Sequence, residues 1–144
     1  MRRMSAKVFL DTNVIIYGYS QDEPEKQQAA RECAKAQESW ISTQVLNETV
    51  NILKRKFSLD YSQIGSVVDE LSHQSQLDIV SLGTIRKALD IAQCYQYSYF
   101  DSLMIASALE VGCDHLYSED LQDGQNIDNT LTISNPFRNI ENSA

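Results

Sequence analysis

Short apolar segments alternate with helical segments along the chain, and this alternation limits the fold more than any other feature of the sequence. Each apolar segment is brief and is followed by polar or turn-forming residues. The expected strands are 7–10, 39–42, 77–80, 115–117 and 130–133. Short, continuously apolar strands separated by helices are typical of a parallel sheet that is buried on both faces. We therefore predict an α/β fold in which helices flank both faces of a short central parallel sheet of four to five strands.

The segments between these strands carry helical signals. Pro24, with acids just before it, favours a helix start. Asp60 and Gln63 have the spacing of a capping box, and apolar residues then recur at helical spacing. The segment 102–111 is apolar on nearly all sides, so we expect that helix to be buried. The expected helices are 13–19, a largely exposed helix over about 24–37, 43–57, 60–71, 84–95 and 102–111.

Composition sets the broad class of the protein. A chain of 144 residues without a repeat or a Pro/Gly/Ser-rich linker predicts a single domain over residues 1–144. No apolar run approaches the ~18 residues of a membrane-spanning helix. The three cysteines are odd in number and widely spaced, which favours a reducing compartment and hence a cytoplasmic protein. Cys94 and Cys113 flank apolar segments, and we expect both to behave as small core residues.

The net charge of −8 argues against a polyanionic partner unless the acids share one cation site. Asp11 directly follows the first predicted strand, and Glu48 lies in the first turns of the helix after the second. Asp101 opens the buried helix, and Asp120 and Asp123 follow the fourth strand. In a parallel sheet these positions project toward the same edge, where ligands bind. Carboxylates so crowded repel one another unless a cation neutralises them, and oxygen ligands suit Mg²⁺ or Mn²⁺.

Each of these acids also has a local explanation. Asp11 could be a turn former, and Asp101 could complete a capping box with Ser98. Glu48 lies at the margin of an apolar arc, where a solvated side chain is equally compatible with the pattern. The acids at 120 and 123 lie in a polar loop, where acids usually face solvent. The ordered placement across four segments favours the joint interpretation.

Four acidic motifs resemble those of PIN-domain ribonucleases, in particular the VapC-type toxins of bacterial toxin–antitoxin pairs. The resemblance extends from Val8 to the 133–137 segment. Two departures stand in the last motif: Gln122-Asp123-Gly124 replaces a frequent Asp-Phe pair, and Ser118 replaces a frequent Thr. The motifs are Leu10-Asp11-Thr12-Asn13, Gln44-Val45-Leu46-Asn47-Glu48, Tyr99-Phe100-Asp101-Ser102 and Tyr117-Ser118-Glu119-Asp120.

The resemblance implies a Mg²⁺- or Mn²⁺-dependent endoribonuclease that hydrolyses RNA to a 5′-phosphate and a 3′-hydroxyl. Asp11, Asp101 and Asp120 would hold metal, Glu48 would orient the attacking water, and Asp123 is an optional further ligand. The resemblance also implies that Asn13 and Ser118 form hydrogen bonds around the site.

The resemblance further implies a homodimer and a small antitoxin that blocks the acidic pocket. The apolar face of the 60–71 helix could serve such a contact or the protein's own core. The five candidate carboxylates account for most of the net charge, so an acidic protein remains compatible with RNA, bound weakly and with magnesium. Arg2, Arg3, Lys7 and the Lys54-Arg55-Lys56 cluster could contact phosphates or simply face solvent.

Other chemistries have less support in the sequence. The two histidines, His73 and His115, do not form a zinc motif, and no glycine-rich phosphate loop is present. An aspartyl-phosphate phosphatase would carry a second Asp two positions after Asp11, where this chain has Asn13. The alternative from another functional class is a catalytically inactive PIN-like scaffold that binds RNA or a protein partner.

Overall fold

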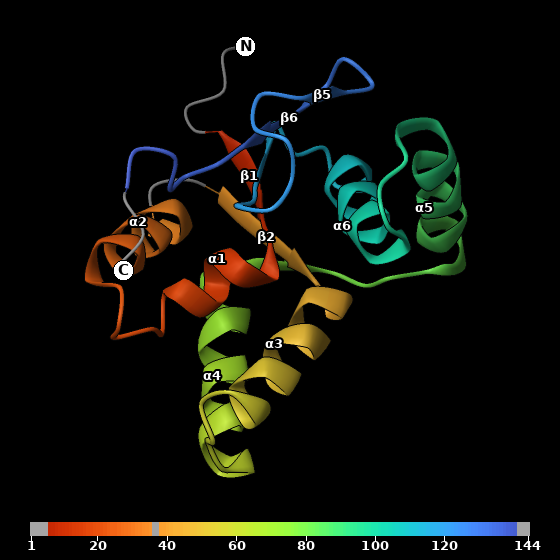
Figure 1. Ribbon diagram of the computed structural model, residues 1–144. Coiled ribbons are helices and arrows are strands. Elements are labelled where there is room, and N and C mark those ends of the chain that lie inside the picture. Colours follow the sequence, from red (N-terminus) through yellow and green to blue (C-terminus); the bar gives the residue numbers. More distant parts are fainter. Residues whose placement is uncertain (1–5, 36–37, 141–144) are drawn as a thin grey trace.

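The protein is a six-stranded α/β sheet flanked by helices, described by a computed structural model over residues 6–35 and 38–140 (Figure 1). The strands are β1 (Lys7–Leu10), β2 (Glu38–Ser42), β3 (Gln76–Asp78), β4 (His115–Tyr117), β5 (Asn126–Ile127) and β6 (Leu131–Ser134). The helices are α1 (Thr12–Tyr17), α2 (Pro24–Lys35), α3 (Thr43–Arg55), α4 (Tyr61–Gln74), α5 (Leu82–Tyr95) and α6 (Tyr99–Glu110).

The sheet has the order β3-β2-β1-β4-β6-β5, and every pairing except β5 with β6 is parallel. The chain runs outward from β1 to β2 and β3, then crosses back to place β4 on the other side of β1. The strand order therefore reverses between β1 and β4. In open parallel sheets the ligand crevice lies at such a reversal, outside the carboxyl ends of the strands.

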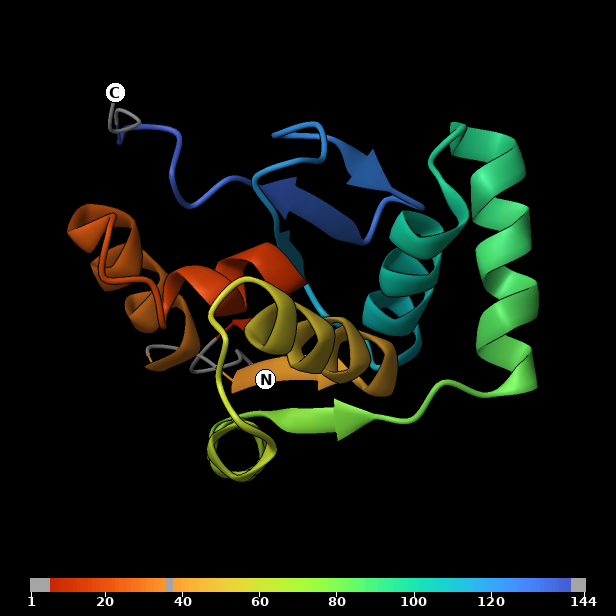
Figure 2. The ribbon, with the colours of Figure 1, turned by 60° about the horizontal axis from the view of Figure 1, so that its bottom comes forward.

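Helices cover both faces, as expected. Figure 1 shows α2 on one side of the sheet and α5 and α6 on the other. Figure 2 shows α5 and α6 side by side, and α6 contacts both β2 and β4. The side chains of Phe9, Ile41, Ile105, Leu116 and Ile133 are fully buried between these layers.

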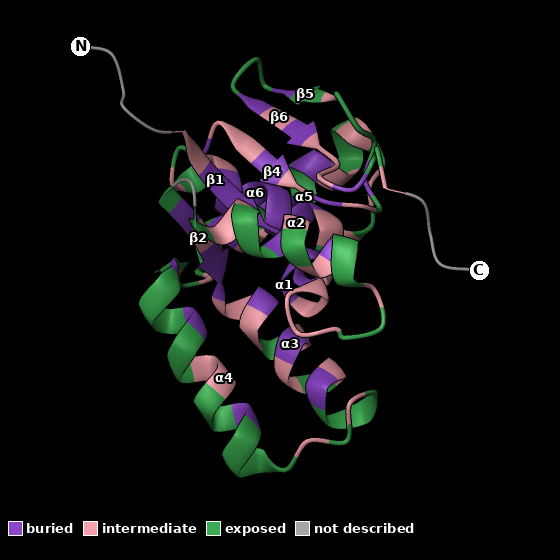
Figure 3. Ribbon diagram, turned by 90° about the vertical axis from the view of Figure 1, so that its left-hand side faces the viewer, coloured by how far each residue is buried: buried purple, intermediate pink, exposed green. Residues whose placement is uncertain are grey.

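Burial follows the hydrophobic pattern of the sequence. In α6 every residue from Ser102 to Ala108 is buried, which confirms the prediction for this helix (Figure 3). The capping box at Asp60 and Gln63 is also present. In α4, Ile64 and Leu71 are buried, so that apolar face serves the protein's own core. Cys113 is buried, whereas Cys94 is exposed, and the prediction of a core role for Cys94 is wrong because its side of α5 faces solvent.

The prediction of four to five strands missed β5, the two-residue antiparallel edge strand. It joins β6 through a turn in which Asp128 and Asn129 have φ of 52° and 59°, and the N–H of Thr130 donates to the carbonyl of Ile127 at 3.1 Å. Asp and Asn tolerate the left-handed backbone that such a hairpin turn requires at both central positions. The Asp128-Asn129 dipeptide was the sequence signal from which β5 could have been predicted. At the other edge, β3 ends at Asp78, two residues before the end of the predicted strand.

Asp78, the last residue of β3, interacts with Glu110, the last residue of α6. Burial and, after it, the neighbouring Glu110 carboxylate together raise the pKa of Asp78 to about 6. One carboxyl oxygen of Asp78 is buried without a hydrogen-bond partner in the described structure. A protonated carboxyl supplies its own donor, so the neutral form suits this position better than the ionised form.

We expect Asp78 to make folding stability depend on pH. The folded state holds this proton more tightly than an unfolded chain, whose Asp has a pKa near 3.8. The contribution is fully present below about pH 4 and is lost as the pH rises through about 6. In urea denaturation, Asp78→Asn should therefore gain stability relative to the parent as the pH rises through this range. The exposed substitution Asp90→Asn should keep the parent's profile, and a parent-like profile for Asp78→Asn would contradict the assignment.

Candidate functional site

The candidate carboxylates Asp11, Glu48, Asp101 and Asp120, near the carboxyl ends of the parallel strands, are called the acidic edge. Asp11 is its centre. It directly follows β1 and occupies the N-cap position of α1, but its side chain forms no capping hydrogen bond. Its Oδ2 instead accepts a hydrogen bond from the Ser118 hydroxyl at 2.8 Å, and its N–H donates to the carbonyl of Tyr117 at 3.1 Å. The carboxylate is thus directed toward the segment after β4, and the local explanation as a turn or cap residue does not account for it.

Ser118 connects the two neighbouring strands at the reversal of the sheet. It is fully buried, and its hydroxyl also accepts from the backbone N–H groups of Asp120 and Leu121, each at 3.3 Å. One hydroxyl group thus joins the end of β1 to the loop that carries Asp120. The resemblance implied hydrogen bonds from Ser118 around the site, and the structure gives it one to Asp11.

Asp120 is exposed, and its Oδ2 accepts a hydrogen bond from the side-chain amide of Asn13. Asn13 belongs to α1, two residues after Asp11. The segments after β1 and β4 are therefore joined both through Ser118 and through Asn13. The resemblance implied hydrogen bonds from Asn13 and Ser118 around the site, and here Asn13 donates to Asp120 and Ser118 to Asp11.

Glu48 lies in the second turn of α3 and is partly buried. Its Oε2 accepts a hydrogen bond from the Thr12 hydroxyl at 2.9 Å, and its Oε1 accepts from the Gln44 amide at 3.2 Å. Thr12 directly follows Asp11, so these bonds hold Glu48 against the same turn. Sequence reasoning missed Thr12 and Gln44, although their positions beside Asp11 and one turn before Glu48 were a usable signal.

Asp101 lies in the first turn of α6. The Ser98 hydroxyl accepts a hydrogen bond from the backbone N–H of Asp101 at 3.2 Å, so Ser98 caps the helix with its own side chain. This is the Ser98 half of the predicted capping box, and it does not use the Asp101 carboxylate. That carboxylate is close enough to Asp11 to influence its ionisation.

The electrostatics of Asp11 show how the acids are gathered. Burial, together with the charges of Asp120 and Asp101 and against the Ser118 hydrogen bond, raises the pKa of Asp11 to about 6. Carboxylates from two other segments therefore act on Asp11. Like charges in a partly buried site destabilise the ionised forms, and a bound cation reverses that effect.

The donor chemistry of this edge fits a hard divalent cation. The candidate ligands Asp11, Asp101 and Asp120 offer only carboxylate oxygens, the ligands that Mg²⁺ and Mn²⁺ prefer. Within residues 6–35 and 38–140, no three side chains of the His, Cys, Asp and Glu types already form a metal-binding group. The acids are thus arranged as neighbours along an edge, with hydrogen bonds from Ser118 and Asn13 holding two of them.

Asp123 is held elsewhere. Its Oδ1 accepts from the backbone N–H of Asn135 at 2.8 Å, and its Oδ2 pairs with the guanidinium of Arg138 at 3.4 Å. The hydrogen bond from Asn135 and the charge of Arg138 lower the pKa of Asp123. Both oxygens thus fasten the segment after β6.

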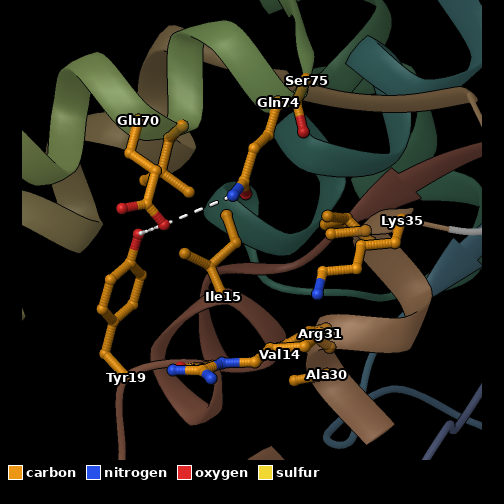
Figure 4. Close-up of a pocket in the computed structure, with 13 residues that line it drawn as sticks. Val14, Ile15, Tyr19, Ala30, Arg31, Lys35, Glu70, Gln74 and Ser75 are labelled. Carbon is orange, nitrogen blue, oxygen red and sulfur yellow. Dashed lines mark hydrogen bonds between the residues drawn. The ribbon is translucent and has the colours of Figure 1, made fainter. Parts of the chain in front are cut away.

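A separate hollow of about 270 Å³ lies between α1, α2 and α4 (Figure 4). Its lining is largely apolar, with Val14, Ile15 and Leu71 among its walls. On its rim Glu70 accepts hydrogen bonds from the Tyr19 hydroxyl at 2.9 Å and the Gln74 amide at 3.3 Å. None of the five candidate carboxylates lines it, so it is distinct from the acidic edge.

The basic candidates are dispersed. Lys54, Arg55 and Lys56 are exposed at the end of α3, with Lys54 over the Tyr61 ring at 4.4 Å. Lys7 lies over the Trp40 ring at 5.1 Å and 4.0 Å from the Glu38 carboxylate. Arg2 and Arg3 fall outside the described residues. One cation was missed altogether, since Lys26 in the supposedly exposed α2 is buried against Glu119.

Comparisons with known proteins agree with the fold. A family model of the PIN domain matches residues 8–122. A toxin–antitoxin complex from Klebsiella pneumoniae superposes with a TM-score of 0.69 at 21% identity, covering 90% of this chain and 97% of that chain. VapC20 of Mycobacterium tuberculosis, a sarcin-ricin loop cleaving toxin, has a TM-score of 0.65 at 18% identity, covering 78% of this chain and 89% of that chain. VapBC2 of Rickettsia felis, bound to a promoter DNA fragment, has a TM-score of 0.65 at 19% identity, covering 90% and 98%. A search of curated proteins found no significant match.

We expect Ser118→Ala to destabilise the folded protein by about 1–3 kcal/mol, because it leaves two backbone N–H groups without their acceptor. Ser102→Ala is the matched control, since Ser102 is equally buried but its hydroxyl has no partner in the described structure. Urea denaturation should show little change for Ser102→Ala. Equal stability of the two variants would mean that the Ser118 hydroxyl does not hold the loop.

Proposed function

Because this chain belongs to the PIN domain family, we propose that it is a metal-dependent endoribonuclease that hydrolyses RNA phosphodiester bonds. We further propose that residues 1–144 form one PIN-like domain. One observation carries the proposal: Asp11 lies at the reversal point of the sheet, and the charges of Asp120 and Asp101, from two other segments, act on its carboxylate.

In this proposal Asp11, Asp101 and Asp120 hold Mg²⁺ or Mn²⁺. When bound, such an ion neutralises the charge that develops on the phosphate and makes water a stronger nucleophile. Glu48 orients the attacking water through a carboxylate that Thr12 and Gln44 hold in place. Water attack on phosphorus leaves a 5′-phosphate and a 3′-hydroxyl.

Asn13 and Ser118 act as supporting groups. Each donates a hydrogen bond to one acid, Asn13 to Asp120 and Ser118 to Asp11. Partners of this kind fix the orientation of metal ligands. With both of its oxygens engaged, Asp123 has the role of fastening the segment after β6, and we do not include it among the ligands.

The mode of RNA binding follows from the charge. The acidic protein should bind RNA weakly and only with a divalent cation, since few basic residues surround the site. The exposed Lys54-Arg55-Lys56 cluster is the available phosphate contact, at the far end of the helix that carries Glu48. With RNA as the substrate, we expect the protein to act in the cytoplasm. No helix in the described part of the chain is long and apolar enough to cross a membrane.

We also propose that the protein is the toxin component of a type II toxin–antitoxin module, with a small antitoxin as its partner. The support is its similarity in fold to toxins and toxin–antitoxin complexes. A homodimer is part of the same proposal. Leu82 and Leu89 are 61% and 55% exposed and lie seven residues apart on α5, an apolar stripe suited to self-association.

We expect Asp11→Asn and Asp101→Asn to reduce RNA cleavage to background while the fold is retained. Each substitution removes one charge of the cation site without changing the shape of the side chain. Asp90→Asn, an exposed substitution on α5, serves as the matched control and should cleave like the parent. Cleavage of a labelled RNA by each purified variant is the measurement, and parent-like activity of either site variant would refute the metal assignment.

Metal removal separates the enzyme from the scaffold alternative. EDTA should stop cleavage, and added Mg²⁺ or Mn²⁺ should restore it. In thermal denaturation without RNA, Mn²⁺ should raise the melting temperature of the parent but not that of Asp11→Asn, because only the folded parent binds the ion. Cleavage that is indifferent to EDTA would indicate another mechanism, and RNA binding with neither cleavage nor metal stabilisation would indicate the inactive scaffold.

A further inference from the structure

A buried lysine lies beside the acidic edge, outside the site described above. Lys26 belongs to the first turn of α2 and is only 3% exposed. Its Nζ donates to Oε2 of Glu119 at 2.7 Å and to the Tyr17 hydroxyl at 3.3 Å. The Tyr17 hydroxyl in turn donates to Oε1 of Glu119 at 2.8 Å. Both carboxylate oxygens of Glu119 are therefore held, each by a different donor.

Aromatic rings enclose this contact. The Nζ of Lys26 lies 4.7 Å from the centre of the Tyr17 ring and 5.7 Å from that of Phe137. The two rings pack edge to face with their centres 4.9 Å apart. The cation is thus surrounded by groups from α1, the loop after β4 and the segment after β6. An ammonium group held between rings and a carboxylate has a well-defined position.

The charges of this cluster are stable at neutral pH. Burial lowers the pKa of Lys26, but the hydrogen bonds and charge of Glu119, together with Tyr17, outweigh burial and raise the pKa above its ordinary value. Burial and the Glu119 hydrogen bond raise the pKa of Tyr17. Lys26 is therefore a cation and Tyr17 a neutral donor.

Glu119 stands between two residues of the site, Ser118 and Asp120. Its side chain turns to Lys26, whereas the Asp120 side chain turns to Asn13. We propose that Lys26 is a positioning residue: its ion pair with Glu119 fixes the loop after β4, so that Asp120, and not Glu119, is presented to the cation. This inference rests on the proposed function, since it assumes that the acidic edge binds a divalent ion.

Stability alone gives little reason for a lysine at this place. Replacing a buried ion pair by apolar groups is often neutral or stabilising. An ion pair with two directed hydrogen bonds instead fixes the orientation of the Glu119 side chain and of the loop after β4. Partners that orient metal ligands typically change metal affinity by 10–100-fold when removed.

The decisive experiment measures Mn²⁺ affinity of the full chain without RNA, by calorimetry or by the electron paramagnetic resonance signal of free Mn²⁺. Lys26→Met should weaken Mn²⁺ binding by roughly 10-fold. A purely electrostatic role predicts the opposite, because removing a nearby positive charge strengthens cation binding. Lys87→Met is the matched control: its ion pair with Asp128, at 3.2 Å, is on the surface, and its loss should change the affinity by less than about twofold.

A charge-balanced double variant keeps the test valid if Lys26→Met fails to fold. Lys26→Met with Glu119→Gln removes both charges and leaves no buried charge unpaired. Since the net charge is unchanged, weaker Mn²⁺ binding by this variant reports positioning alone. Unchanged or tighter binding by folded variants would overturn the inference, whereas a parent that binds no Mn²⁺ would refute the proposed function itself.

Discussion

The hydrogen bond between Ser118 and Asp11 is the contact on which the acidic edge depends. It joins the ends of β1 and β4, the two strands between which the order of the sheet reverses. Parallel pairing of these strands brings their carboxyl ends level, and the buried Ser118 hydroxyl then connects the residues that follow them. Because the same hydroxyl accepts from the backbone N–H of Asp120, it also holds the backbone of that residue beside Asp11. The remaining acids come from helices that pack around this junction.

The electrostatics of Asp11 make the proposed action on RNA compatible with an acidic protein. Burial and, after it, the charges of Asp120 and Asp101 raise the pKa of Asp11, so this position is unfavourable for an ionised carboxylate and favourable for a divalent cation. The nearby acids that do not belong to this edge are neutralised by partners of their own. Glu119 pairs with Lys26, and Asp123 pairs with Arg138. Negative charge is therefore concentrated at the acidic edge, where a divalent cation would bind.

Much of the fold could be predicted from local patterns. The strand β1 and the helix α6 have the expected positions because a run of apolar residues must be buried whatever its neighbours are. Two features could not be predicted from apolar runs alone. The strand β5 has only two residues and depends on its antiparallel pairing with β6. Cys94 is exposed, since its burial depends on which side of α5 faces α6, and a single cysteine does not determine that.

The sequence by itself determined the helices and all strands except β5, the positions of the acids at their ends and the chemistry those acids offer. Only the tertiary structure decided which acids meet and which are diverted to other partners. Asp120 and Glu119 are adjacent and chemically alike, yet one contacts Asn13 and the other contacts Lys26. The physical reason is that backbone periodicity is a local property, whereas the partner of a polar side chain comes from a distant segment. Ser118 and Asp11 are 107 residues apart and are brought together by the pairing of their strands.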